Sequence, residues 1–143
     1  MKTSRIVIIS LIIMCSAYTS FSQIMFQNMN REAVYVAFAR YVNNGTSGFW
    51  VTKGWSRVSS GTSIKAFDAI NLTDSIGYFV IARISETEYP GTRNLLVHIN
   101  EQFLINNADQ ELVSQNNPDY EWRQFRLIRL QSGKTSGTIS FKD

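Results

Sequence analysis

The chain has 143 residues, of which 44% are hydrophobic, 13% aromatic and 17% charged, with a formal net charge of +3. This length suits one domain that buries a core without disulfides or structural metals. A nucleic-acid-binding surface needs clustered Lys and Arg, and so small a net charge argues against one. We therefore expect no nucleic-acid partner.

The N-terminal residues predict a secretory signal peptide over residues 1–22. Lys2 and Arg5 precede an apolar run at 6–15, and a more polar stretch ends with small residues at −3 and −1 of a cleavage site after Ser22. The apolar run has only about half of the ~20 residues that a membrane-spanning helix needs. We expect export to the periplasm or outside the cell, with no stable membrane insertion after cleavage.

The single cysteine, Cys15, lies within this apolar run. Met14 precedes it where a lipoprotein peptidase requires a small residue, so no lipid anchor is expected. Cleavage would remove this thiol together with Lys2 and Arg5, leaving 12 basic and 11 acidic residues and a net charge of +1. The predicted mature domain, residues 23–143, is therefore nearly neutral and free of disulfides.

The mature part contains short apolar runs separated by turn residues. This pattern predicts an all-β fold, either a compact antiparallel β-sandwich or a partly open barrel. After a first strand at 24–28, the clearest strand covers 34–42 and is apolar on both faces, which indicates a central position in a sheet. One face carries Val34, Val36 and Phe38, and the other carries Tyr35, Ala37, Ala39 and Tyr41.

Turn signals divide the rest of the chain into further strands. Asn44-Gly45 predicts a tight hairpin turn, and Gly54 marks an interruption in the strand that follows. Asn107 is placed to cap a helical turn over 108–114, with Gln110 at the reciprocal capping position. The predicted strands span 49–58, 64–67, 77–84, 95–99, 125–130 and 138–141, the last two joined by a turn at 132–134.

Several of these segments together resemble the bacterial domain of unknown function 1036. That family shows an Asn after the first strand, a V-x-V-A strand, a W-x-x-x-G-W hairpin return and a Y-x-x-x-A strand. The matching segments here are Asn28, Val34–Ala37, Trp50–Trp55 and Tyr78–Ala82, and the resemblance covers most of 24–141. The family's cysteines are absent from this chain, which excludes shared disulfides. The resemblance implies no activity, because none is established for the family.

Catalytic and metal-binding patterns are weak. His98 is the only histidine and is predicted to face away from Leu95, Val97 and Ile99, as a surface residue does. One histidine without cysteine does not favour zinc. The acidic residues Asp109, Glu111, Asp119 and Glu121 do not match the spacing of a calcium-binding loop. We expect no metal and no cofactor.

Two charged groups have a specific interpretation. Glu86 and Glu88 lie two residues apart at the end of a predicted strand, and two carboxylates at suitable separation could hydrolyse a glycoside. Arg123, Arg126 and Arg129 sit inside an apolar run and are predicted to form the solvated edge of a strand. Any acidic loop supplies a carboxylate pair, so the sequence favours a protein without catalytic activity.

The aromatic side chains give the clearest indication of binding. Trp50 and Trp55 are five residues apart and face opposite sides of a regular strand, unless a bulge between them reverses the parity. An exposed tryptophan beside Tyr35, Tyr41 or Tyr78 would form a flat apolar platform for a sugar ring or a protein partner. These five residues are the predicted ligand-binding residues.

Three functional hypotheses follow from the sequence. The first is an exported, non-enzymatic binding or structural accessory protein whose partner is a protein or a glycan. The second is a carbohydrate-binding module that uses exposed aromatic residues. The third is a secreted hydrolase that acts through acidic residues. Surface exposure of the aromatic residues separates the first two hypotheses, and a cleft lined by two close carboxylates would support the third.

Overall fold

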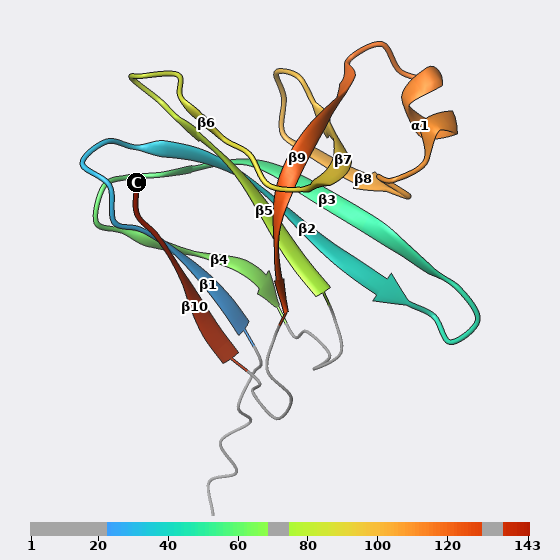
Figure 1. Cartoon of the computed structure of the whole chain (residues 1–143), viewed down its shortest axis with the longest axis horizontal. Helices are drawn as coiled ribbons and strands as arrows, with labels where there is room; N and C mark the ends of the chain where they lie inside the picture. Colours follow the sequence, from blue (N-terminus) through green and yellow to red (C-terminus); the bar gives the residue numbers. More distant parts are fainter. Residues whose placement is uncertain (1–22, 69–74, 130–135) are drawn as a thin grey trace, which may run out of the picture.

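The computed structural model describes residues 23–68, 75–129 and 136–143 and confirms an all-β fold (Figure 1). The described strands and helix are β1 (Gln23–Asn28), β2 (Val34–Asn43), β3 (Gly48–Val58), β4 (Ser63–Asp68), β5 (Ser75–Ala82), β6 (Glu88–Tyr89), β7 (Arg93–His98), β8 (Phe103–Asn106), α1 (Glu111–Gln115), β9 (Tyr120–Arg129) and β10 (Ser136–Phe141). Within these ranges, no helix is long and apolar enough to span a membrane.

The strands form two sheets. A three-stranded sheet has the order β10-β1-β4, and a seven-stranded sheet has the order β7-β9-β5-β2-β3-β8, with β6 paired to β5. The larger sheet curls into a nearly closed antiparallel barrel, and the smaller sheet packs on its outer face. The fold thus combines the two predicted architectures. One pair departs from the antiparallel prediction, because β1 and β10 run parallel.

The predicted central strand, β2, pairs with β3 on one side and β5 on the other. Its even-numbered residues contribute to a core between the two sheets, and its odd-numbered residues Ala37 and Ala39 contribute to a second core inside the barrel. β5 alternates in the same way, with Tyr78 in the first core and Phe79 in the second. The apolar character of both faces follows from the two cores.

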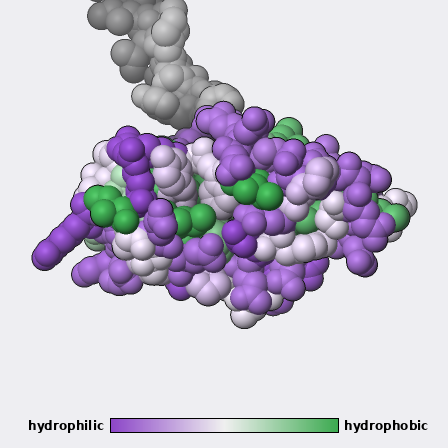
Figure 2. All heavy atoms as spheres, turned by 90° about the horizontal axis from the view of Figure 1, so that it is seen from above, coloured by the Kyte–Doolittle hydropathy of each residue, from purple (hydrophilic) through white to green (hydrophobic). Residues whose placement is uncertain are grey.

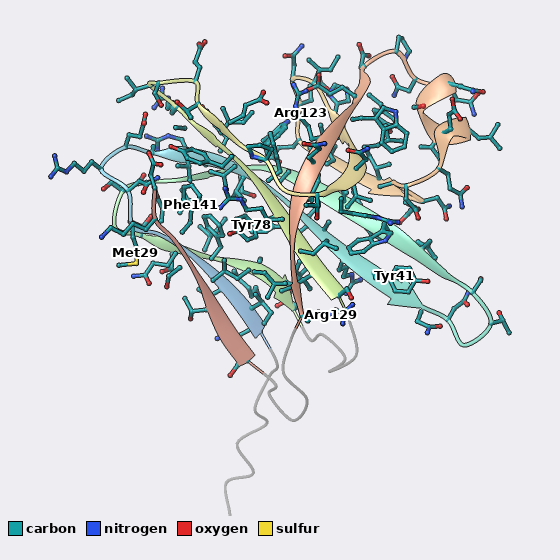
Figure 3. All side chains as sticks on the ribbon, in the orientation of Figure 1. Met29, Tyr41, Tyr78, Arg123, Arg129 and Phe141 are labelled. Atoms are coloured by element: carbon teal, nitrogen blue, oxygen red, sulfur yellow. The ribbon has the colours of Figure 1, made fainter. Side chains whose placement is uncertain are left out.

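The core between the sheets is rich in aromatic side chains. The ring of Phe26 in β1 lies 5.6 Å from the ring of Phe38 and 5.7 Å from that of Tyr78, both in edge-to-face contact. It also stacks on Phe141 in β10 with a centroid separation of 6.0 Å. Figure 3 shows Tyr78 and Phe141 pointing toward one another between the layers. The contacts of Phe26 and Phe141 with Phe38 and Tyr78 attach the three-stranded sheet to the barrel.

The barrel is closed between β3 and β7 by individual hydrogen bonds. The buried Thr52 hydroxyl donates to the Leu96 carbonyl at 2.6 Å. The Leu96 amide donates to the Ala108 carbonyl at 2.8 Å, and the Ala108 amide donates to the Trp50 carbonyl at 2.9 Å. Through these two hydrogen bonds Ala108, which is fully buried, bridges β3 and β7 from the segment that leads into α1.

Several predicted boundaries need correction. The helix begins at Glu111 with Gln110 as its N-cap, so the capping role predicted for Asn107 is wrong. Asn107 instead adopts a positive φ of 53° in the preceding turn. β5 ends at Ala82, which leaves Ile84 exposed in a turn. The predicted signal peptide, the turn at 132–134 and residue 130 of a predicted strand lie outside the described residues.

Candidate functional site

A β-bulge in β3 brings the second tryptophan to the barrel interior. Phe38 pairs with Lys53, but Val36 pairs with Ser56, so Gly54 and Trp55 together lie opposite the single residue Ala37. An unbroken register would place Trp55 opposite Val36, on the face that meets the other sheet. The bulge reverses this parity, and both tryptophans belong to the barrel core.

The side chain of Trp55 is held firmly in this position. Its indole Nε1–H donates to the His98 carbonyl at 2.8 Å, which adds a further link between β3 and β7 where the barrel closes. Its ring makes edge-to-face contacts with Phe79 at 6.1 Å and with Phe103 at 6.0 Å. The remaining part of the half-buried ring faces an opening at one end of the barrel. A preformed aromatic surface of this kind needs no ordering when a ligand binds.

The opening is a pocket of about 410 Å³, which we call the barrel-mouth pocket. Its volume lies in the range typical of small-molecule sites. Side chains from four strands and the β7–β8 turn converge on it, and it combines two aromatic rings with two aliphatic and three polar side chains. The lining residues are Tyr35, Trp55, Ile81, Ile99, Asn100, Glu121 and Arg123.

Charged side chains enter the pocket from β9. An Arg123 guanidinium nitrogen lies 2.7 Å from the Glu121 carboxylate and 3.7 Å from that of Glu88. The guanidinium carbon lies 6.0 Å from the centre of the Phe79 ring, so the cation also contacts the aromatic core. Arg123 Nε is buried without a hydrogen-bond partner among the described residues. The pocket therefore offers a carboxylate acceptor and an arginine donor beside its aromatic rings.

The position of Arg123 corrects the prediction for the arginine cluster. β9 pairs with β7 over residues 120–125 and with β5 over residues 126–129, so all three arginines lie in paired parts of the strand rather than at an unpaired edge. Phe125 is buried in the barrel, and alternation places Arg123 and Glu121 on the same inner face toward the mouth. Figure 3 shows Arg123 on the half of β9 next to β7, and Arg129 at the far end of the strand. Arg126 and Arg129 are exposed.

The structure brings only two of the five predicted binding residues together, Tyr35 and Trp55. Trp50 and Tyr78 are only 5% and 9% exposed, so the prediction that they bind a ligand is wrong and they serve as core residues. Tyr41 is half-buried and packs on Trp50 with a centroid separation of 5.6 Å, away from the mouth and toward the β2–β3 hairpin (Figure 3). A continuous platform of all five rings does not form.

The remaining pocket residues were missed by the sequence analysis. Glu121 and Arg123 could have been found from their alternation with the buried Phe125, which shares their face of the strand. Ile99 and Asn100 follow β7 in a turn, and no motif marks them. In that turn the amides of Asn100 and Glu101 donate to His98 Nδ1 at 3.3 and 3.1 Å. The only histidine thus holds the loop that forms one wall of the pocket.

The acidic residues do not gather into a reactive cluster. Glu86 and Glu88 are both exposed, and the nearest charge to Glu88 is Arg123. Within the described residues, no group of three or more His, Cys, Asp or Glu side chains is placed to hold a metal ion. Asp109 forms an ion pair with Arg93 at 3.3 Å rather than joining Asp119 or Glu121.

A second hollow lies outside the barrel beside α1. Its volume is about 610 Å³, and its aromatic lining residue is Trp122, which is 39% exposed. The other lining residues are polar or charged: Thr92, Arg93, Asn94, Asp109 and Glu111. The second hollow thus presents a single aromatic ring, and its Arg93 and Asp109 are already paired with each other. The barrel-mouth pocket, with two aromatic rings, is therefore the better candidate site.

Comparisons of the chain with protein-family models, with curated proteins and with solved structures found no match. The class that the structure defines is an all-β protein in which a nearly closed barrel carries a small second sheet.

Proposed function

We propose that this protein is an exported, non-enzymatic binding protein and that the barrel-mouth pocket binds a neutral carbohydrate. The observation that carries the proposal is the meeting of Tyr35 and Trp55 with Glu121 and Arg123 at one opening. Sugar rings have apolar C–H faces that pack on aromatic rings, and hydroxyl groups that both donate and accept hydrogen bonds.

The charges in the pocket favour a neutral ligand over an ionic one. Arg123 is already paired with Glu121 and lies near Glu88, so its positive charge is offset and does not favour an anionic ligand. A hydroxyl group can accept from the exposed part of the Arg123 guanidinium and donate to a Glu121 oxygen, since both side chains are partly exposed. The amide of Asn100 supplies a further donor and acceptor at the rim.

A small ligand also fits the face shown in Figure 2 better than a broad protein interface does. Figure 2 shows hydrophobic residues scattered singly among hydrophilic ones on the face that it presents. Large contiguous apolar patches are the usual mark of stable protein–protein contact. The resemblance to the domain of unknown function 1036 stays a prediction and adds no ligand of its own.

Export rests on the sequence of residues 1–22 and is tested separately. We expect the protein recovered from the periplasm or the medium of a bacterial host to begin at Gln23. Mass spectrometry of the intact protein measures this directly. Recovery of the unprocessed chain in the cytoplasm would contradict the proposed export, and would leave the binding proposal to be judged on its own experiment.

The binding experiment follows the indole N–H of Trp55 by two-dimensional NMR during titration. The probes are glucose, galactose, N-acetylglucosamine and their disaccharides. We expect at least one sugar to shift this resonance in a saturable way. Tyr35→Ala should weaken that binding by about tenfold, because one aromatic contact contributes about 0.5–1.5 kcal/mol beyond its buried area.

Trp122→Phe is the matched control, since it changes an exposed tryptophan in the second hollow. It should leave the affinity unchanged. Equal weakening by Tyr35→Ala and Trp122→Phe, or no saturable shift with any of the sugars, would refute carbohydrate binding at the barrel mouth.

A further inference from the structure

A second candidate binding site lies between the two sheets, on the side of the molecule away from the barrel interior. Lys53 pairs with Phe38 and with Leu104, and Arg40 pairs with Val51, so these residues share the face of the large sheet that meets the small one. The β2–β3 hairpin extends beyond the three-stranded sheet (Figure 1). A hollow of about 250 Å³, which we call the interlayer groove, is lined by Arg40, Val51, Lys53, Phe67, Asp68 and Leu104.

Two cations converge on one aromatic ring in this groove. Lys53 Nζ lies 4.9 Å from the centre of the Phe67 ring, and the Arg40 guanidinium carbon lies 5.9 Å from it. Their strand register makes them diagonal neighbours on adjacent strands, within reach of one another for long side chains. A lysine stem commonly covers an apolar ring. Such packing explains why the Lys53 side chain lies over Phe67, but it does not explain the second cation, Arg40, over the same ring.

Neither cation of the groove forms an ion pair with a described carboxylate. Among the described residues, no carboxylate lies within 4.0 Å of the Lys53 or the Arg40 charge. Asp68, the acidic residue of the groove, is paired with Lys65 instead. Burial lowers the pKa of the Lys53 ammonium; the Asp68 carboxylate opposes this, and Arg40 and Lys65 lower the pKa further. Lys53 is thus a partly desolvated cation beside two others.

We propose that the interlayer groove binds a phosphate-type oxyanion between Arg40 and Lys53. A planar guanidinium offers two parallel donors to such a group, and an ammonium adds a compact point charge. The ring of Phe67 forms an apolar wall beneath both cations, which strengthens their attraction for an anion. The site is separate from the barrel mouth, because the two openings share no lining residue and lie on opposite faces of the large sheet.

The experiment is an NMR titration of the protein with inorganic phosphate at constant ionic strength. We expect saturable shifts of the Lys53 and Phe67 amides. Lys53→Gln and Arg40→Gln should each weaken binding about tenfold, as expected for the loss of one charge-assisted hydrogen bond. Asp68→Asn should strengthen binding severalfold, because it removes the negative charge that lines the same groove. Arg57→Gln, which removes an exposed cation of the same strand, should change nothing.

Glucose 6-phosphate, with glucose as its uncharged control, identifies the source of the oxyanion. Tighter binding of the sugar phosphate would assign the group to a larger ligand, and equal binding would assign it to the free ion. If a cation variant does not fold, Asp68→Asn still tests the site, because the Asp68 side chain is exposed and its replacement should not disturb folding. Shifts that do not saturate, or equal weakening by Arg57→Gln, would overturn the proposal. Tyr35→Ala should leave phosphate binding intact, so this proposal and the carbohydrate proposal fail independently.

Discussion

Asn28 is a fully buried polar residue, and its replacement by alanine should destabilise the protein strongly. Its side-chain amide donates to the Glu32 carbonyl at 2.8 Å and to the Val58 carbonyl at 3.0 Å. Its side-chain oxygen accepts from the Asn30 amide at 3.0 Å. The residue therefore fixes the β1–β2 connection and attaches it to the end of β3.

The magnitude follows from these three hydrogen bonds. Each contributes about 1 kcal/mol net, and truncation also leaves buried partners unsatisfied, so Asn28→Ala should cost about 3–4 kcal/mol. A domain of this size loses roughly 3–5 °C of melting temperature per kcal/mol, which corresponds to a fall of about 10–20 °C. Asn94→Ala, at an exposed position of β7, should stay within about 0.5 kcal/mol of the parent.

Asn28→Asp separates hydrogen bonding from packing, because it preserves the shape of the side chain. The introduced carboxylate faces two carbonyl oxygens, so its pKa in the folded state lies above its unfolded value. A group with a raised folded pKa stabilises the fold at low pH and loses that contribution as the pH rises. Asn28→Asp should therefore be less destabilising at pH 4 than at pH 7, whereas Asn28→Ala should show no such difference.

Thermal and urea unfolding followed by circular dichroism measure all three variants. A loss below about 1 kcal/mol for Asn28→Ala would refute the assignment of these hydrogen bonds. An Asn28→Asp variant with the same penalty at both pH values would show that the amide donors do not face the two carbonyls.

Two further predictions concern titrating groups. Tyr89 donates a hydrogen bond to the Asp143 carboxylate at 2.7 Å, and this bond raises the pKa of the Tyr89 phenol to about 12. The pair therefore stabilises the fold fully below pH ~10, and this stabilisation is lost as the pH rises through about 12. A ¹³C NMR titration should show that value, and Asp143→Asn should return it toward 10. Hydrogen bonds from the Ile84 amide and the Ser85 hydroxyl lower the pKa of the Glu32 carboxyl group. The ionised Glu32 therefore stabilises the fold near neutral pH, and this stabilisation is lost as the pH falls through the lowered pKa. Glu32→Gln should accelerate hydrogen exchange at the Ile84 amide at pH 7, and unchanged exchange would contradict this role.

The strands were predictable because side-chain alternation in this chain is strong. Val34, Val36 and Phe38 share one core as their spacing predicts, and β2 is central as its two apolar faces require. The sequence could not show that these faces meet two different cores. That depends on how far the large sheet curls, and on the parallel pairing of β1 with β10, whose partners lie more than a hundred residues apart.

The candidate site was only partly predictable for the same reason. Tyr35 and Trp55 were expected to bind a ligand, but Trp50 and Tyr78 carry the same aromatic character and are buried. Burial depends on what covers a face, and composition does not reveal that. Arg123 was predicted to lie at a solvated strand edge with Arg126 and Arg129, although it alternates with the buried Phe125. That alternation, in the part of β9 that pairs with β7, places Arg123 on the inner face at the barrel mouth.

The bulge at Gly54 decides which face Trp55 occupies, and so it can be tested on its own. A Cβ atom at Gly54 would lie 3.0 Å from the Ala37 Cα and 3.2 Å from the Phe103 ring. The backbone of the central strand cannot yield easily, so Gly54→Ala should cost about 1–3 kcal/mol and weaken the hydrogen bond from Trp55 to the His98 carbonyl. The indole N–H resonance of Trp55 should then shift and exchange faster.

Gly137→Ala provides the matched control in β10, because a Cβ atom there would lie 3.6 Å from the Ile24 Cδ1, an ordinary contact. It should be neutral or slightly stabilising, since alanine restricts the unfolded chain more than glycine does. If Gly54→Ala proved as stable as Gly137→Ala and left the indole resonance in place, the close packing of the bulge against β2 would be wrong. The barrel mouth would then lose the feature that fixes its aromatic wall, because nothing else in β3 places Trp55 on the same face as Tyr35.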